Sequence, residues 1–312
     1  MSVGTGKGKT ILFGEHFVVY GLPSLAAGIA AETIARVKRS SKPGWTLKDK
    51  RPAVPGYKQE KAEEQSASID NIVKYLGIDL TRQGIDILFE GNLTCASGIG
   101  ASAASCVALA RALNSEFRLG LNDDQINQAA YEGEKGYHGT PSGVDNTCST
   151  FGGLIWFKTN PNAPPTFEKL RLDRPLSLVI AATGITASTK RVVDDVKAKK
   201  EHDPSWFSNI ADEYAHLVED ARHALLRLDL DRTGQLMDRN HELLQDLTVS
   251  CAELDRLVAV ARENGAVGAK LTGTGRGGNM IALAPDPKSA SAIGKALKKA
   301  GAAELWVTNF GT

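Results

Sequence analysis

The chain has 312 residues, of which 42% are hydrophobic, so it is long enough to form two domains with a core each. The 37 lysines and arginines nearly balance 36 acidic residues, and this excludes a general electrostatic attraction to nucleic acid or anionic membranes. No stretch approaches the ~20 apolar residues of a transmembrane helix, and Gly14, Glu15 and His16 interrupt the apolar run near the N-terminus.

The cysteine pattern argues against a disulfide framework. Four cysteines show neither CxxC nor regular spacing: Cys95, Cys106, Cys148 and Cys251. In a chain of this size they are typical of reduced thiols. We therefore expect a cytoplasmic protein.

The first third of the chain predicts short strands, a loop and a helix. Residues 9–38 alternate apolar and polar side chains around turn signals, which indicates successive strands. Residues 40–59 are rich in proline and glycine, and we expect a long loop. A helix over 63–76 then places four apolar side chains on one face: Ile69, Ile72, Val73 and Leu76.

The middle of the chain continues with a strand over 85–89 and two helices. The first helix is expected to bury Cys106, Leu109, Ala110, Leu113 and Phe117. Asn122 is a good N-cap for the second, which carries Ile126, Ala129, Ala130 and Gly133. We expect a glycine-rich loop over 133–146, a strand over 154–157 and a surface excursion over 160–165.

The second half interleaves strands with helices. We expect strands over 176–182, 267–271, 280–284 and 305–308, and helices over 188–199, 206–228, 231–245 and 252–263. This pattern predicts an α+β domain. We place the boundary near Arg174, which gives domains of residues 1–174 and 175–312.

The segment GIGASAAS at 98–105 predicts a phosphate-binding loop. Gly98 and Gly100 allow close approach of the backbone to an anion, and the next residues open a helix whose first N–H groups have no internal partner. A tight turn before a packed helix is the alternative. The segment is not a Walker A motif because no lysine follows the second glycine. Lys9 is the natural source of the missing positive charge, unless it is simply a solvated lysine at a strand end.

Two carboxylates lie in the segment 133–146. Phosphoryl transfer needs an oxygen shell for Mg²⁺ and a carboxylate facing the attacking hydroxyl, and Glu134 and Asp145 suit these roles. Asp145 could instead cap a helix. Glu15 and His16 form a polar turn between two apolar runs, so they are either a capped corner or a pair that faces the substrate.

Four motifs in this order resemble the GHMP small-molecule kinases over nearly the whole chain. They are KTILFGEHFVVYG at 9–21, GIGASAAS at 98–105, HGTPSGVDN at 138–146 and KLTGTGRGG at 270–278. The resemblance implies an N-terminal α/β domain with a left-handed βαβ unit and a C-terminal ferredoxin-like domain. That handedness is a rare exception to the right-handed crossover rule.

The resemblance also implies roles for individual residues. Asp145 and Lys9 match the catalytic pair, and Ser102 and Glu134 match the residues that hold Mg²⁺ with the ATP phosphates. The phosphate loop comprises Gly98, Ile99, Gly100, Ala101, Ser102 and Ala103. Substrate-binding positions are Glu15, His16, Ser188 and Thr189.

Within this family the match is strongest to the branch that phosphorylates mevalonate. It implies ATP-dependent phosphorylation of (R)-mevalonate at the 5-hydroxyl in isoprenoid biosynthesis, with ATP and Mg²⁺, no nucleic acid or membrane partner, and a homodimer as one form of assembly. A phosphomevalonate, homoserine or sugar kinase is the alternative. A sugar kinase would continue the GEH motif differently from residues 17–21. A catalytically silent binding protein is another alternative, but such a relative tends to lose the catalytic acid or lysine.

The sequence departs from the family pattern in three places. The usual Ala-Pro-Gly-Lys opening reads GKGK at 6–9, the usual double serine reads Ala101-Ser102, and Arg276 stands in the third glycine loop. Arg276 either clamps a phosphate or points to solvent, and we expect it to point to solvent.

Overall fold

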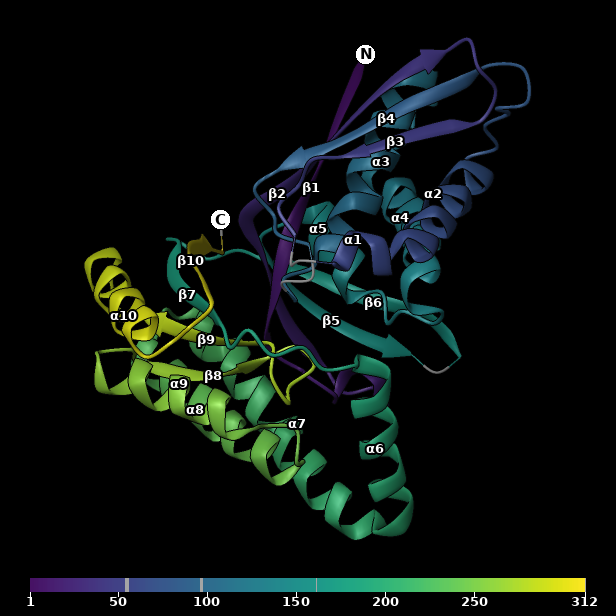
Figure 1. Ribbon diagram of the computed structural model, residues 1–312. Coiled ribbons are helices and arrows are strands. Elements are labelled where there is room, and N and C mark those ends of the chain that lie inside the picture. The colour runs from purple at the N-terminus through teal and green to yellow at the C-terminus, as the bar shows by residue number, and fades with distance from the viewer. Residues whose placement is uncertain (54–55, 96–97, 161, 312) are drawn as a thin grey trace. The chain divides into compact units, whose positions relative to one another are not determined.

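The computed structural model describes residues 1–53, 56–95, 98–160 and 162–311. The chain forms two compact units, each visible in Figure 1. The first contains Met1–Lys9 and Gly28–Gly152, and the second contains Thr10–Ala27 and Gly153–Thr312. Strands β1 (Ser2–Phe13) and β2 (Ser24–Ser40) contribute residues to both, so neither unit is one continuous segment.

The sheet of the first unit is built around β2. It pairs antiparallel with β4 (Gly84–Gly91), and β3 (Trp45–Asp49) runs parallel to β4 on the outside. Strand β1 also pairs with β2. The connection from β3 to β4 passes through α1 (Tyr57–Glu60) and α2 (Ala62–Tyr75), so the unit contains a βαβ element, as predicted.

Four longer helices form the core of the first unit with this sheet. Helices α2, α3 (Ala101–Phe117) and α4 (Asp123–His138) pack against one another, and α5 (Val144–Phe151) packs against α3 and α4. Most of the predicted apolar faces are buried, with Ile72, Leu109 and Ile126 in one cluster, and three members pack against it while partly exposed: Val73, Leu76 and Phe117. Asn122 caps α4 as predicted, through a reciprocal pair of hydrogen bonds with Gln125.

The second unit has the predicted ferredoxin-like sheet. Its strands are β7 (Leu176–Ala182), β8 (Gly268–Thr272), β9 (Asn279–Ala284) and β10 (Glu304–Phe310). They lie in the order β10-β7-β9-β8, with every pair antiparallel. Counted along the chain this order is 4-1-3-2, which is the split βαβ arrangement of the ferredoxin-like fold.

The remaining elements of the second unit surround this sheet. Its helices are α6 (Thr189–His202), α7 (Pro204–Leu226), α8 (Leu230–Asp246), α9 (Ala252–Glu263) and α10 (Pro287–Lys299). Helices α8, α9 and α10 pack on the strands, and α7 packs on α8 (Figure 1). The short helix η1 (Val18–Tyr20) packs on β5 (Leu154–Asn160), which pairs with the start of β2 and with β6 (Ala163–Leu170).

Several elements were not predicted, including the short helices α1 and η1. The expected loop over 40–59 contains β3, and the expected excursion over 160–165 leads into β6; residues 54–55 and 161 lie outside the described residues. Both strands lie at sheet edges, where pairing with β4 or β5 stabilises segments whose local sequence is polar or rich in proline. Helix α10 was also missed.

The expected loop over 133–146 is mostly helical. Helix α4 continues to His138 and α5 begins at Val144. The glycines that suggested a loop serve helix packing instead: a Cβ at Gly133 would lie 2.7 Å from Ile72 Cδ1, and one at Gly136 would lie 2.4 Å from the Ser68 nitrogen. Glu134 is therefore fixed on a helix rather than on a mobile segment.

Within the described residues, no helix combines the length and the apolar character that membrane crossing requires.

Candidate functional site

The predicted phosphate loop ends at the N-terminus of α3. Gly98 and Gly100 have φ angles of 71° and 80°, in the left-handed region that favours glycine. Ile99 between them is buried. Among the described residues no side chain caps α3, and the N–H groups of Ala101, Ser102 and Ala103 precede the first helical hydrogen bond, from the Ala104 nitrogen to the Gly100 carbonyl oxygen. This is the arrangement that binds phosphate.

Lys9 lies against this loop. Its backbone nitrogen donates to the Ile99 carbonyl oxygen at 2.8 Å, and its Nζ lies 3.0 Å from Asp145 Oδ1. A Cβ at Gly100 would lie 2.7 Å from Lys9 Cγ, so only glycine leaves room for the lysine stem. Asp145 stands in the first turn of α5. Three distant segments of the first unit thus meet at the lysine.

Glu134 is a buried carboxylate close to Ser102. Burial and the nearby charge of Asp145 raise the pKa of Glu134 to about 8, while a hydrogen bond from Ser102 lowers it. His138 Nε2 lies 3.8 Å from Glu134 Oε2 and 3.4 Å from Ser102 Oγ. Among the described residues no cluster of three or more His, Cys, Asp or Glu side chains forms a metal site. A cation here would therefore need oxygen ligands from elsewhere, such as phosphates and water.

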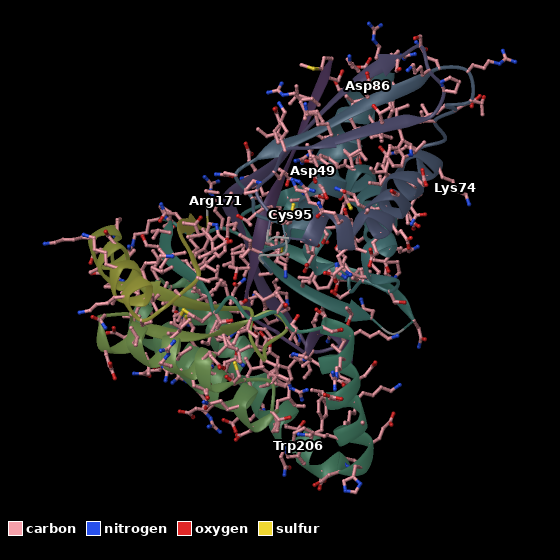
Figure 2. All side chains as sticks on the ribbon, viewed as in Figure 1. Asp49, Lys74, Asp86, Cys95, Arg171 and Trp206 are labelled. Atoms are coloured by element: carbon pink, nitrogen blue, oxygen red, sulfur yellow. The ribbon has the colours of Figure 1, made fainter. Side chains whose placement is uncertain are left out.

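Arg51 supports the start of α3 and was missed by sequence reasoning. Its Nη1 donates to the Ala101 carbonyl oxygen at 3.2 Å, and its Nε and Nη2 donate to Asp49 at 3.1 and 2.7 Å. Lys58 Nζ donates to the backbone carbonyl oxygens of Asp49 and Arg51. Figure 2 labels Asp49 at the end of β3, the strand that sequence reasoning took for a loop.

The second unit holds the other predicted residues. Glu15 forms an ion pair with Lys270, with Nζ and Oε1 2.5 Å apart and both side chains fully buried. The second oxygen of Glu15 has no hydrogen-bond partner among the described residues. Burial lowers the pKa of Lys270, and Glu15 raises it. Glu15 therefore stabilises its turn from the interior through an ion pair with Lys270, a partner that the sequence did not predict.

His16 follows on this turn with a positive φ of 61°. Its Nε2 lies 2.8 Å from the Thr274 carbonyl oxygen, and burial lowers its pKa. The Thr274 hydroxyl lies 2.7 Å from the Thr189 hydroxyl at the start of α6. Ser188 caps α6 by accepting a hydrogen bond from the Arg191 nitrogen.

The side chain of Arg276 is partly exposed and has partners within the second unit. Its Nη1 lies 2.5 Å from Asp195 Oδ2 on α6, and its Nε donates to the Thr248 carbonyl oxygen. The expectation of a solvent-facing side chain is therefore wrong. The guanidinium ties the glycine loop to two neighbouring segments, because a carboxylate and a carbonyl satisfy it locally.

Comparison with known proteins places these observations in a family. Models described as the GHMP kinases N terminal domain and GHMP kinases C terminal match residues 66–153 and 221–303. The mevalonate kinase of Pyrococcus horikoshii is 34% identical over 297 residues, which cover 89% of this chain and 87% of that protein. The mevalonate kinase of Thermococcus sibiricus is 33% identical, with coverage of 94% and 91%.

A solved structure is similar over the full length. The crystal structure of L. major mevalonate kinase in complex with R-mevalonate has 43% sequence identity to this chain and a TM-score of 0.94. The match covers 99% of this chain and 96% of that one. Similarity at this level, together with both domain models, shows that the chain belongs to the GHMP kinase family and, within it, to the mevalonate kinases.

Proposed function

We propose that this chain transfers the γ-phosphoryl group of ATP to the 5-hydroxyl of (R)-mevalonate, giving 5-phosphomevalonate and ADP in isoprenoid biosynthesis. The observation that carries the proposal is the ion pair of Lys9 and Asp145, 3.0 Å apart and adjacent to the phosphate loop. The similar L. major structure, a complex with R-mevalonate, supports the substrate. ATP is the co-substrate of the family.

The residues of the first unit supply the chemistry. The N–H groups of Ala101, Ser102 and Ala103, at the positive end of α3, bind the ATP phosphates. Asp145 orients the 5-hydroxyl and takes its proton as the oxygen bonds to the γ-phosphorus and the bond to ADP breaks. Lys9 holds Asp145 in place and offsets negative charge on the transferring group.

The donor set at Ser102 and Glu134 fits Mg²⁺. A hydroxyl and a carboxylate are hard oxygen ligands, and their low number suits an ion that retains water and phosphate ligands. Glu134 gives a further reason, because burial and Asp145 make its negative charge costly unless a cation lies beside it. We propose that these two residues hold Mg²⁺, which when bound neutralises charge on the phosphates.

Four residues of the second unit serve substrate binding in this proposal. His16 and Thr189 supply the direct polar contacts to mevalonate. Glu15 fixes the turn that carries His16, through its ion pair with Lys270. Ser188 fixes the helix start that carries Thr189. A site that hydrogen-bonds each polar group of a small substrate rejects analogues that lack one.

Three broader expectations remain proposals. The domain division at residues 1–174 and 175–312 assigns the hairpin of β5 and β6 to the N-terminal domain. The absence of any disulfide among the four cysteines agrees with a cytoplasmic location. Assembly as a homodimer is the third.

A coupled ADP-release assay tests the function. The enzyme is offered mevalonate, phosphomevalonate, homoserine and galactose in turn, with Mg²⁺ and ATP. We expect rapid ADP release with mevalonate alone, and its loss in Asp145→Asn purified in the same way, which excludes a contaminating kinase. Preference for another substrate would replace the substrate assignment, and ADP release with none of the four would overturn the proposal.

A further inference from the structure

Two residues of β8 and one residue of the turn after it contact the segment that ends at His16. Lys270 pairs with Glu15, and the Thr272 hydroxyl donates to the Ile11 carbonyl oxygen at 2.8 Å. Two residues on, the Thr274 carbonyl oxygen lies 2.8 Å from His16 Nε2. Lys270 and Thr272 are alternate residues of β8 and so lie on the same side of the strand, and Thr274 lies in the turn that follows. These three residues contact the end of β1 and the turn after it at Ile11, Glu15 and His16.

Thr274 is the member of this series that also reaches the second substrate segment. Its hydroxyl lies 2.7 Å from the Thr189 hydroxyl, in the first turn of α6. The backbone of one residue thus holds His16, while its side chain holds Thr189. In the proposed function, His16 and Thr189 are the two residues that contact mevalonate directly.

The contact with Thr274 decides which nitrogen of His16 carries a proton. A carbonyl oxygen only accepts hydrogen bonds, so Nε2 must donate and therefore holds a hydrogen. Burial lowers the pKa of His16, which favours the neutral ring. In the neutral ring with the proton on Nε2, Nδ1 is an acceptor. Such a ring recognises a donor such as a hydroxyl, whereas a carboxylate needs a donor or a cation.

The loop that carries Thr274 is itself held firmly. The Arg276 nitrogen donates to the Val249 carbonyl oxygen at 2.8 Å, and its guanidinium pairs with Asp195. The Gly278 nitrogen donates to the Ile185 carbonyl oxygen at 2.6 Å. A residue on such a loop can fix its neighbours to the accuracy that selective binding needs.

We propose that Thr274 is a positioning residue for substrate selection: its carbonyl holds His16 with Nδ1 as an acceptor for a mevalonate hydroxyl, and its side chain holds the Thr189 hydroxyl. This rests on the proposed function. Thr274 acts through His16 and Thr189, and its substitution should therefore change the binding of mevalonate rather than that of ATP.

The first test needs no substrate. ¹⁵N NMR of the imidazole rings in the ligand-free protein reports the tautomer, and the His16 signals are assigned by their loss in His16→Asn. At neutral pH we expect a neutral ring protonated on Nε2. A ring protonated on Nδ1, or a charged ring, would overturn the assignment of Nδ1 as acceptor, whichever substrate the enzyme uses.

The second test compares Thr274→Val with Thr274→Ser. The valine removes the hydroxyl and should raise the KM for mevalonate roughly fivefold to tenfold, the usual effect of one lost hydrogen bond, with the KM for ATP within about twofold of the wild type. The serine keeps the hydroxyl and should restore the wild-type KM. Equal changes in both KM values, or a serine variant as impaired as valine, would refute the positioning role.

A double substitution distinguishes the positioning role of Thr274 from a general loss of stability in Thr274→Val. If Thr274 acts through Thr189, then adding Thr274→Val to Thr189→Val should raise the KM for mevalonate little further. Independent, additive effects would contradict the proposal. Failure of the wild type to phosphorylate mevalonate would instead refute the proposed function, and the NMR result would still decide the tautomer.

Discussion

The ammonium group of Lys9 lies 3.0 Å from the carboxylate of Asp145, although the two residues belong to β1 and α5. The lysine side chain is only 8% exposed, whereas that of Asp145 is 31% exposed. The carboxylate therefore stays accessible while its partner is held by the surrounding structure. In the proposed mechanism, Asp145 is thus oriented before the substrate binds, which reduces the ordering that the reaction requires.

Replacing Asp145 by asparagine should lower turnover by roughly 10² to 10⁴, the usual contribution of a positioned acid or base. The amide keeps the shape but cannot take the proton. Turnover is measured by ADP release. The affinity for ATP is measured by calorimetry and should be nearly unchanged. Asp124→Asn, at an exposed acidic position in the first turn of α4, is the matched control. Near wild-type turnover in Asp145→Asn would remove this residue from the mechanism.

Ser102→Ala and Glu134→Gln should each raise the Mg²⁺ concentration needed for half-maximal activity. If the two residues share one ion, the double variant should be little worse than the more impaired single one, because each single change already disrupts the same site. Magnesium titrations of all four proteins at saturating ATP provide the measurement. Strictly additive effects with an unchanged Mg²⁺ requirement would count against a shared ion.

Glu134 should make the ligand-free protein less stable as the pH rises. Its pKa is raised in the folded state from 4.5 to about 8, so the folded state binds the proton more tightly than the unfolded chain. The free energy of unfolding should therefore fall between these two values, by up to ~1.4 kcal/mol per pH unit. Denaturant titrations across this range should show the fall in the wild type and a flatter profile in Glu134→Gln. Parallel profiles would mean that Glu134 is charged throughout.

His16→Ala and Thr189→Val should each lower kcat/KM for mevalonate by about 1 to 3 kcal/mol, the cost of leaving a polar group unpaired. The affinity for ATP should change little, because the candidate phosphate loop belongs to the first unit. Steady-state kinetics with each substrate varied in turn separates the two effects. Wild-type mevalonate kinetics in both variants would end their assignment as substrate contacts.

The buried pair of Glu15 and Lys270 should be sensitive to the loss of either partner. Glu15→Met or Lys270→Met alone leaves an uncompensated charge in the core, at a cost of roughly 3 to 5 kcal/mol in unfolding free energy. Combining Glu15→Met with Lys270→Met removes both charges and should recover much of the loss. Denaturant unfolding measures all three. Additive destabilisation in the double variant would show that the two charges do not depend on each other.

Elements with strong local signals were predictable. Asn122, followed by two acidic residues, marked the start of α4, and apolar spacing marked the buried faces of α2, α3 and α4. Strand β3 gave no such signal, because its stability comes from parallel pairing with β4. The glycines of α4 led to the prediction of a loop where the structure has a helix. Gly133 and Gly136 permit close contact between helices, and local sequence cannot distinguish this use of glycine from a turn.

In the candidate site, too, residues with a local sequence signal were predictable and residues that depend on tertiary contacts were not. Motifs indicated Lys9, Ser102, Glu134 and Asp145, and the structure places Lys9 beside Asp145. The residues that hold such groups in place were not identified from the sequence: Arg51 lies outside the motifs, and the motif at 270–278 did not reveal the partner of its first residue. Arg51 reaches the Ala101 carbonyl from a segment expected to be a loop, and Lys270 meets Glu15 across a sequence separation of 255. Such long-range pairs depend on tertiary packing, which spacing along the chain does not encode.

The tight fit between Gly100 and Lys9 makes these two positions epistatic. A side chain at residue 100 would meet the lysine stem at 2.7 Å and would also have to adopt a φ of 80°. A library that randomises residue 100 in the presence of Lys9 should therefore return glycine almost exclusively among active clones. Shortening residue 9 first would remove the steric barrier but also the ammonium group.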